Sequence, residues 1–442
     1  ENMKISDGGS TILYNIAIIN ESYCEKVVEE IIKQIQKEEI SADTTIQMRY
    51  LGIISNIHSS GDERYSTICI KHGATDAIMK ACEIPDILVQ MITLEYIPNI
   101  MLTNIGIDYL ITSLVLNPTN LSIQPLTHLE WLLLSSSNEG DDYLRAQCLL
   151  CTAKLLSTLE KINHSFCNSV EFKYQTKIVP LFLSYISNVL ESLTESDRLA
   201  AILSLTTFAT SSPSAYKNTL SNPNLLIAWL SLLRSQPSIQ GPVLHSIAQI
   251  LLYPKVLLND DEITRNQTNL MITNPSNDIN KQFSSIFLSL LSKTNENTES
   301  SINSIIDSLH AFKKNLFDMI GSYVGRFTTI EYLLKCVKQP IIEVKKGATD
   351  ILRSLAYQNN IWGLELLMSN IQFYNYLKDR TTEYSKEEKE WKFSLIIAIY
   401  FSPNSHLLSD EIKSILREMI LQGPYYMPPR LEEPVTEEKG SS

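Results

Sequence analysis

A chain of 442 residues is too long for one compact core, so it either divides into several domains or forms an array of repeats. Hydrophobic residues make up 44% of it, which is ample for burial, whereas 14 glycines and 17 prolines are too few for the frequent turns of an all-β chain. The net charge of −12 and the lack of a dense lysine and arginine face argue against nucleic acid as a partner. Basic proteins fit this charge better, and a role in solubility fits it equally well.

Cysteine usage and hydropathy indicate the compartment. The seven cysteines are odd in number and scattered, unlike a disulfide framework, so the sequence predicts a reducing compartment, the cytoplasm or also the nucleus. The longest apolar runs, such as residues 225–233, are far too short to span a bilayer, and no secretory signal is visible. We therefore expect no membrane association. Since the sequence starts at Glu1 rather than at methionine, a segment upstream of it stays open.

Helical periodicity dominates along the chain, and few segments show the alternation of a strand. Residues 199–209 are apolar on nearly every side, as in a helix clamped between neighbours. Thr194 and Ser385, each followed three residues later by an acid, match the capping box that opens a helix. Two apolar stripes at helical spacing are formed by Leu144, Cys148, Cys151, Leu155 and Leu159, and by Val344, Ala348, Ile351, Leu352 and Leu355.

The helices group into repeats of pairs or triplets. Short loops that contain glycine, residues 71–73 and 104–106, precede apolar helices, as glycine does before the third helix of an armadillo unit. Charged residues near helix openings recur at irregular multiples of roughly 40 to 55 residues, close to the HEAT and armadillo range: Arg49, Arg145, Arg198 and Lys345. The sequence therefore predicts an all-α fold, a right-handed HEAT/armadillo-like α-solenoid of about eight to ten degenerate units.

Composition indicates only gradual boundaries within this solenoid, because its core is continuous. Residues 1–258 are predicted to be its N-terminal part, and residues 282–422 its C-terminal repeats. Between them, residues 259–281 are rich in Asn, Asp and Thr and are predicted to be a polar loop between repeats. Residues 423–430 form an end segment, because Pro424 lacks an amide proton and two prolines follow the tyrosine pair. Residues 431–442 are predicted to be a disordered acidic tail.

No constellation of residues indicates an enzyme. Cys148 and Cys151 have the spacing of half a zinc site, but no second pair exists and both lie on an apolar stripe, so we expect buried core residues. The seven histidines are dispersed, outside any metalloprotease or hydrolase motif, and no phosphate-binding loop is present. Residues 347–350 lie in a helix and are interpreted as packing. We expect no catalytic residue, no metal and no cofactor, and we expect the four tryptophans to be core.

The C-terminal part of the chain carries more specific motifs. They are Gly423-Pro424-Tyr425-Tyr426, the segment 373–383 with the pattern Phe-x-x-Tyr-x-x-Asp-Arg-x-x-Glu, and a helix over 343–356 followed by a corner at Trp362. With these motifs, residues from about 320 to 429 resemble the family of the proteasome assembly chaperone called non-ATPase regulatory subunit 5 (S5B). A weaker similarity covers about 48 to 113. The family has Lys-Pro-Val where this chain has Met427-Pro428-Pro429, and a proline where it has Ile361.

The resemblance implies a helical solenoid without enzymatic activity, which chaperones assembly of the base of the proteasome 19S regulatory particle. Members bind the C-terminal domain of one AAA ATPase of the base and escort its subcomplex with a second ATPase and a large non-ATPase scaffold subunit. They leave before the 26S particle is complete. Members also extend further at the N-terminus. For this chain the resemblance implies the same partners, and we expect a monomer when it is alone.

Two questions stay open at the level of sequence. The first is a rival function, a generic armadillo or HEAT adaptor that holds a peptide or protein partner in its groove. The second is the role of the predicted partner-binding residues, Arg380, Glu383, Tyr425 and Tyr426. The two tyrosine rings either fold back on a final helix over 410–421 and cap the solenoid, or one points outward as an anchor for the ATPase domain.

Overall fold

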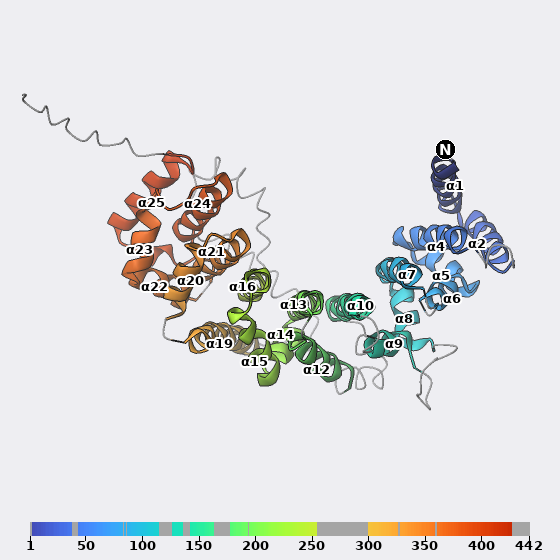
Figure 1. Cartoon of the computed structure of the whole chain (residues 1–442), viewed down its shortest axis with the longest axis horizontal. Coiled ribbons are helices and arrows are strands. Elements are labelled where there is room, and N and C mark those ends of the chain that lie inside the picture. The colour runs from blue at the N-terminus through green and yellow to red at the C-terminus, as the bar shows by residue number, and fades with distance from the viewer. Residues whose placement is uncertain are drawn as a thin grey trace, which may run out of the picture. The chain divides into compact units, whose positions relative to one another are not determined.

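The computed structural model describes the chain in segments: residues 2–37, 43–82, 84, 86–114, 126–135, 142–162, 177–192, 194–253, 299–325, 328–358 and 360–426. Within them the chain is helical, and an isolated antiparallel bridge between Leu114 and Thr127 takes the place of a sheet (Figure 1). The prediction of an all-α fold is confirmed. Residues 259–281 and 431–442, predicted to be a loop and a tail, lie outside the described residues.

The chain forms two compact units, and unit 1 is Glu1–Trp229. Its helices are α1 (Asn2–Ala17), α2 (Glu21–Ile35), α4 (Thr44–Ser59), α5 (Glu63–Lys71), α6 (Ala74–Ala81), α7 (Ile87–Ile100), α8 (Asn104–Thr112), α9 (His128–Ser135), α10 (Asp142–Ile162), α12 (Val179–Leu190), α13 (Glu195–Ala209) and α14 (Pro213–Leu220), with α15 (Pro223–Ser231) at its end. α4 packs on α7, α7 on α10, and α10 on α13, while α5 packs on α8 and α8 on α9. The unit is thus two rows of stacked helices, which is the arrangement of a solenoid.

Unit 2 is Leu230–Ser442 and repeats this arrangement. Its elements are the short helix η2 (Leu232–Arg234), α16 (Pro237–Leu252), α19 (Glu299–Val324), α20 (Thr329–Val337), α21 (Ile342–Ala356), α22 (Trp362–Ser369), α23 (Ile371–Lys378), α24 (Lys386–Tyr400), the short helix η4 (Ser405–Leu407) and α25 (Asp410–Gln422). One row runs from α16 through α21 and α24 to α25, and the other contains α19, α20 and α23. Among the described helices of both units, none is long and apolar enough to cross a membrane.

Ion pairs link successive long helices within each unit. In unit 1, Arg145 of α10 donates to the carboxylate of Asp197 on α13, 52 residues later. In unit 2, Nζ of Lys345 on α21 lies 2.8 Å from Oε1 of Glu388 on α24, 43 residues later. Both intervals fall in the predicted repeat range of roughly 40 to 55 residues. Two of the four charged residues seen near helix openings, Arg145 and Lys345, therefore link neighbouring repeats, whereas Arg198 donates to the carbonyl oxygen of Ser192, just before its own helix.

α16 and α21 approach through two glycines. A Cβ atom added at Gly241 would lie 2.8 Å from Cβ of Glu343, and one added at Gly347 would lie 2.7 Å from Cβ of Leu244 and 2.8 Å from the carbonyl oxygen of Gly241. Such distances are shorter than van der Waals contact, so only glycine fits at either position. Residues 347–350 are therefore packing residues of a helix, as the sequence predicted.

The two glycine-containing loops differ in the structure. Gly73 has φ of +70°, which glycine adopts without strain, and α6 begins at the next residue, as predicted. The predicted loop at 104–106 is wrong, because these residues already belong to the first turn of α8, with Thr103 as its N-cap. Gly106 serves close packing instead, since an added Cβ would lie 2.0 Å from the carbonyl oxygen of Ile100.

Helix starts also differ from the predicted capping boxes. α13 begins after Thr194, but the hydroxyl of Thr194 donates to Asp197 and accepts no amide bond, because the buried Asp197 carboxylate faces it. At Ser385 half of the box forms: Oγ accepts from the amide of Glu388 at 3.1 Å, while the Glu388 carboxylate accepts from the amide of Tyr384. A complete box opens α20 at Thr328 and Glu331.

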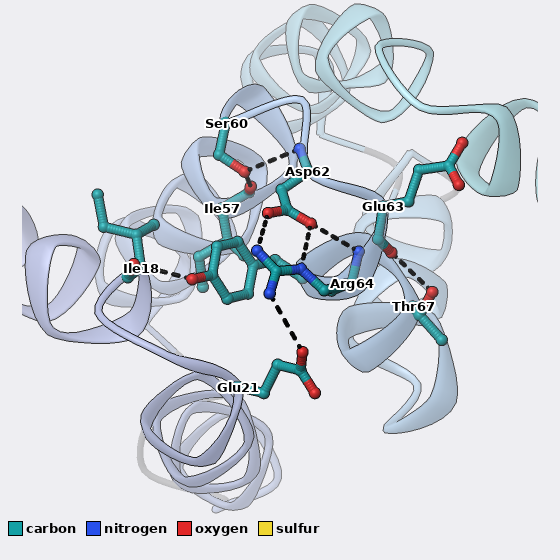
Figure 2. A network of polar contacts seen from close by, with 9 residues as sticks. Ile18, Glu21, Ile57, Ser60, Asp62, Glu63, Arg64 and Thr67 are labelled. Carbon is teal, nitrogen blue, oxygen red and sulfur yellow. Dashed lines mark hydrogen bonds and ion pairs between the residues drawn. The ribbon is translucent and has the colours of Figure 1, made fainter.

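Side chains at the corner between α4 and α5 contact the first two helices of unit 1 (Figure 2). Asp62 caps α5 by accepting from the amide of Arg64 at 2.9 Å, and the Arg64 guanidinium lies against Asp62 and reaches Glu21 at 3.5 Å. Beside it, the hydroxyl of Tyr65 donates to the carbonyl oxygen of Ile18 at 2.9 Å. The ion pairs are exposed and contribute little to stability, so the buried Tyr65 is the firmer link to the end of α1.

The predicted core is confirmed for the cysteines and for one tryptophan. Cys148 and Cys151 are both buried in α10, and Sγ of Cys151 donates to the carbonyl oxygen of Leu94 at 3.3 Å. Burial raises the pKa of the Cys151 thiol to about 11, which disfavours the thiolate that a metal requires. Trp229 is fully buried, whereas the other tryptophans, Trp131, Trp362 and Trp391, are only half-buried.

Candidate functional site

The residues predicted to bind a partner lie together at the C-terminal end of unit 2. Arg380 and Glu383 belong to the turn between α23 and α24, and Tyr425 and Tyr426 follow directly after α25. α24 packs on α25, and α20 and α22 pack on α23, so these helices hold the turn and the end segment in place. We call residues 379–385 with residues 423–426 the terminal cluster.

A buried lysine organises the turn. Lys392 of α24 is 3% exposed, and its Nζ donates to Oγ1 of Thr382 at 2.7 Å, to Oε2 of Glu383 at 3.0 Å and to the carbonyl oxygen of Asp379. The same ammonium lies 4.2 Å from the centre of the Tyr376 ring. Burial lowers the pKa of Lys392, and the carboxylate of Glu383 opposes this shift. Glu383 therefore points inward, as the counter-ion of a buried charge.

Arg380 closes the last helix. Its two terminal nitrogens donate to the carbonyl oxygens of Met419 at 2.9 Å and Gly423 at 3.1 Å, which lie at the C-terminal end of α25. Such carbonyls lack partners within the helix, and a cation there also suits the helix dipole. Partial burial lowers the pKa of the guanidinium from its ordinary value. Arg380 is thus a cap for α25.

Removing the Arg380 guanidinium is expected to destabilise unit 2. Hydrogen bonds from a charged donor contribute about 1.5–3 kcal/mol, so we expect Arg380→Ala to lower the free energy of unfolding by about that amount. Urea titration followed by circular dichroism measures this change. Arg417→Ala is the matched control, because Arg417 is exposed on the same helix. Equal stability of the two variants would contradict the capping role.

The tyrosine pair is about half exposed to solvent. Tyr425 is 49% exposed and Tyr426 is 40% exposed, so of the two alternatives left open by the sequence, full burial of both rings on the last helix is not observed. Instead, the hydroxyl of Tyr425 donates to the carboxylate of Glu390 on α24, and Nζ of Lys386 lies 6.0 Å from its ring centre. Gly423 makes this turn possible with φ of +76°. The end segment contacts α24 at its edge and leaves ring surface free.

Two residues were missed from the sequence: Tyr384 of the terminal cluster, and Lys392, which donates to the turn of that cluster. Lys392 shares a helical face with Leu395, Ile396 and Ile399, and this spacing could have placed it inside. Tyr384, within the turn, is 87% exposed, the most exposed of the large hydrophobic side chains that the structure describes. Nothing in the sequence distinguishes Tyr384 from other loop residues, so its high exposure could not be predicted.

Among the described residues, one group has the geometry to hold a metal ion: Glu25, Glu29 and His72 of unit 1. His72 lies 3.1 Å from Glu25 and 3.6 Å from Glu29, through different ring nitrogens. Nζ of Lys71 lies 3.6 Å from the same oxygen of Glu25. The ammonium of Lys71 thus already faces the Glu25 oxygen that this group would offer to a metal ion.

Comparison with known proteins gives one family match and a set of remote structural likenesses. Residues 266–439 match the model of a family described as Proteasome non-ATPase 26S subunit, and no curated protein matches the chain.

An engineered protein is 15% identical over 93% of both chains, with a TM-score of 0.40. A designed armadillo repeat protein is 15% identical over 74% of this chain and 99% of its own, with a TM-score of 0.37. A structure from a study of cadherin and beta-catenin is 10% identical over 90% of this chain and 67% of its own, with a TM-score of 0.34. These scores are below 0.5, so the fold described above rests on the chain's own helices, and the family match relates its C-terminal part to proteasome subunits that are not ATPases.

Proposed function

We propose that this chain is a non-enzymatic chaperone for assembly of the base of the proteasome 19S regulatory particle. In this proposal it binds the C-terminal domain of one base AAA ATPase and escorts the subcomplex of that ATPase with a second ATPase and a large non-ATPase scaffold subunit. It leaves before the 26S particle is complete, and it acts in the cytoplasm or also in the nucleus. The observation that carries the proposal is the family match over residues 266–439, a range that contains α19 to α25 and the terminal cluster.

The terminal cluster supports a division of roles among the four predicted residues. Tyr425 and Tyr426 keep 49% and 40% of their surface exposed, and tyrosine is enriched among the residues that dominate binding energy. Arg380 donates its hydrogen bonds to the end of α25, and Glu383 accepts one from Lys392. We therefore assign the contact with the ATPase domain to the tyrosines, and the positioning of this surface to Arg380 and Glu383.

Affinity purification from a cell lysate, followed by mass spectrometry, tests the proposal. Recovery of a base ATPase together with a second ATPase and a large non-ATPase subunit supports it. Recovery of transport or signalling proteins without proteasome subunits favours the generic armadillo or HEAT adaptor. Binding to the isolated C-terminal domain of the recovered ATPase then identifies the direct partner.

Truncating the tyrosine pair should weaken binding without weakening the fold. Because neither tyrosine is buried in the core, we expect the double variant Tyr425→Ala, Tyr426→Ala to keep its melting temperature, while its affinity for the ATPase domain falls by about tenfold or more. Isothermal titration calorimetry and a thermal melt measure the two properties. Tyr23→Ala is the control, since Tyr23 is 46% exposed on α2 of the other unit. A lower melting temperature with unchanged affinity would favour the capping role instead.

A further inference from the structure

Lys313 of α19 is a buried amine that no carboxylate among the described residues pairs with. Its side chain is 5% exposed, and within the described part of the chain its Nζ makes one hydrogen bond, to the neutral amide oxygen of Gln358 at 3.3 Å. Lys392 is the informative contrast, because it is equally buried but has the carboxylate of Glu383 at 3.0 Å. An ammonium at Lys313 would thus lie in an apolar site with a single dipole to stabilise it.

Gln358 joins several elements at this place. Its Nε2 donates to the carbonyl oxygens of Leu251 at the end of α16 and Ser354 of α21, at 2.9 and 2.8 Å. Its own backbone carbonyl accepts from the side chain of Asn404, next to η4, at 2.9 Å. The amide side chain is therefore fixed in orientation, and its oxygen is the group that faces α19.

The ionisable side chains that the structure describes on the neighbouring elements either have other partners or are exposed. On α16 and α21, His245 and Asp350 pair with each other at 3.0 Å, and Arg353 also binds Asp350. On α20, Glu331 caps its own helix, and on α22, Glu365 is exposed. On α19 itself, His310 lies one turn before Lys313, and Lys314 points to solvent. Burial lowers the pKa of Lys313 to about 7, with no charged neighbour contributing.

We propose that Lys313 is a pH-operated latch, which holds α19 docked in unit 2 while its amine is neutral and releases α19 when the amine is protonated. The docked contact combines apolar packing with two hydrogen bonds to the backbone of α19. Leu316 and Phe317 are buried, and the rings of Phe317 and Trp362 lie 5.9 Å apart. Oγ1 of Thr329 donates to the carbonyl oxygen of Phe317 at 3.0 Å, and the guanidinium of Arg234 on η2 donates to the carbonyl oxygen of Tyr323. Undocking returns the ammonium to water, where the ordinary pKa of lysine is 10.5. The undocked state therefore binds protons more strongly than the docked state, and undocking increases as pH falls from 10.5 to 7.

Hydrogen exchange with mass spectrometry on the full chain tests the latch. After correction for the intrinsic exchange rate, the opening constant of peptides from residues 313–324 should rise by about fifty-fold between pH 9 and pH 7, because each pH unit above the folded pKa changes it about tenfold. In Lys313→Met, which keeps the length and apolar stem of the side chain, the opening constant should not change over this range. Lys314→Met is the matched control, since it removes the neighbouring exposed lysine, and it should behave as the wild type does.

Two outcomes would overturn the latch. One is an opening constant at residues 313–324 that stays level between pH 9 and pH 7 in the wild type. The other is a rise in Lys313→Met that equals the rise in the wild type, which would assign the effect to other groups. Peptides from α4 and α7 of unit 1 serve as an internal reference, because a general loss of stability would change their exchange as well.

Discussion

Asp197→Ala is expected to lower the free energy of unfolding by about 3–5 kcal/mol, because it removes a buried carboxylate that pairs with the Arg145 guanidinium. Asp197 is fully buried on α13, and its side chain accepts from Arg145 on α10, from Oγ of Ser192 at 3.1 Å and from Oγ1 of Thr194. Arg145 itself is only 15% exposed. The loss should be seen as a lower midpoint in urea titration of the full chain.

Glu195→Ala is the control for this prediction. Glu195 lies in the same first turn of α13 but is exposed, so its removal costs at most the favourable interaction with the helix dipole, about 0.3–1 kcal/mol. A double-mutant cycle with Arg145→Ala separates the pair from its surroundings. If the loss in Asp197→Ala were as small as that in Glu195→Ala, Asp197 would not hold α10 and α13 together.

Acid should destabilise unit 1 through two buried histidines. His58 is fully buried, with Nδ1 3.0 Å from Oγ of Ser66 and Nε2 3.1 Å from Oγ1 of Thr75. Burial lowers its pKa from 6.5 to about 4. Burial also lowers the pKa of His128 to about 4, where the ring stacks on Tyr109 at 5.1 Å, and Asp76 opposes this shift.

The direction of the effect follows from proton binding. Below pH 6.5 the unfolded chain binds protons at these imidazoles while the folded chain does not, so stability is fully present above pH 6.5 and is lost as pH falls toward 4. A shift of this size corresponds to about 3 kcal/mol for each histidine. Urea titrations at pH 7.5, 5.5 and 4.5 measure the loss.

Glutamine variants assign the acid effect to its residues. His58→Gln keeps a polar side chain that does not titrate, so its loss of stability between pH 7.5 and 4.5 should be about 3 kcal/mol smaller than that of the wild type. His128→Gln should remove the second share, and the double variant both. If the pH profile of the double variant matched that of the wild type, the carboxylates rather than the histidines would govern the acid response.

The helices could be predicted because their signal is local and repeated. The stripes through Cys148 and through Ala348 fix both the helix and its buried face, and both cysteines lie where that face predicts. The same locality explains the misses. Thr194 and Asp197 have capping-box spacing, but Arg145, 52 residues away in the sequence, withdraws the carboxylate from the cap. A short stretch of sequence around Thr194 does not contain that arginine, so its effect could not be predicted locally.

The sequence motifs predicted where the terminal cluster lies, but they did not predict how its side chains are oriented. Tyrosines after a final helix are compatible with burial on it or with exposure, and the outcome depends on α24, which supplies Glu390 and Lys386 as partners for Tyr425. Likewise, Arg380 and Glu383 stand three residues apart in one turn, yet they face different helices. Which side a turn residue faces depends on its tertiary neighbours, and these cannot be deduced from its own segment.

The glycine contact between α16 and α21 limits how unit 2 can vary among related sequences. Since backbone meets backbone at Gly241 and Gly347, a larger side chain at one position cannot be offset by a smaller one at the other. Most packed pairs of residues can change together, one becoming larger as the other becomes smaller, but Gly241 and Gly347 cannot compensate each other in this way. We therefore expect the spacing between these two repeats to stay constant wherever both glycines are kept.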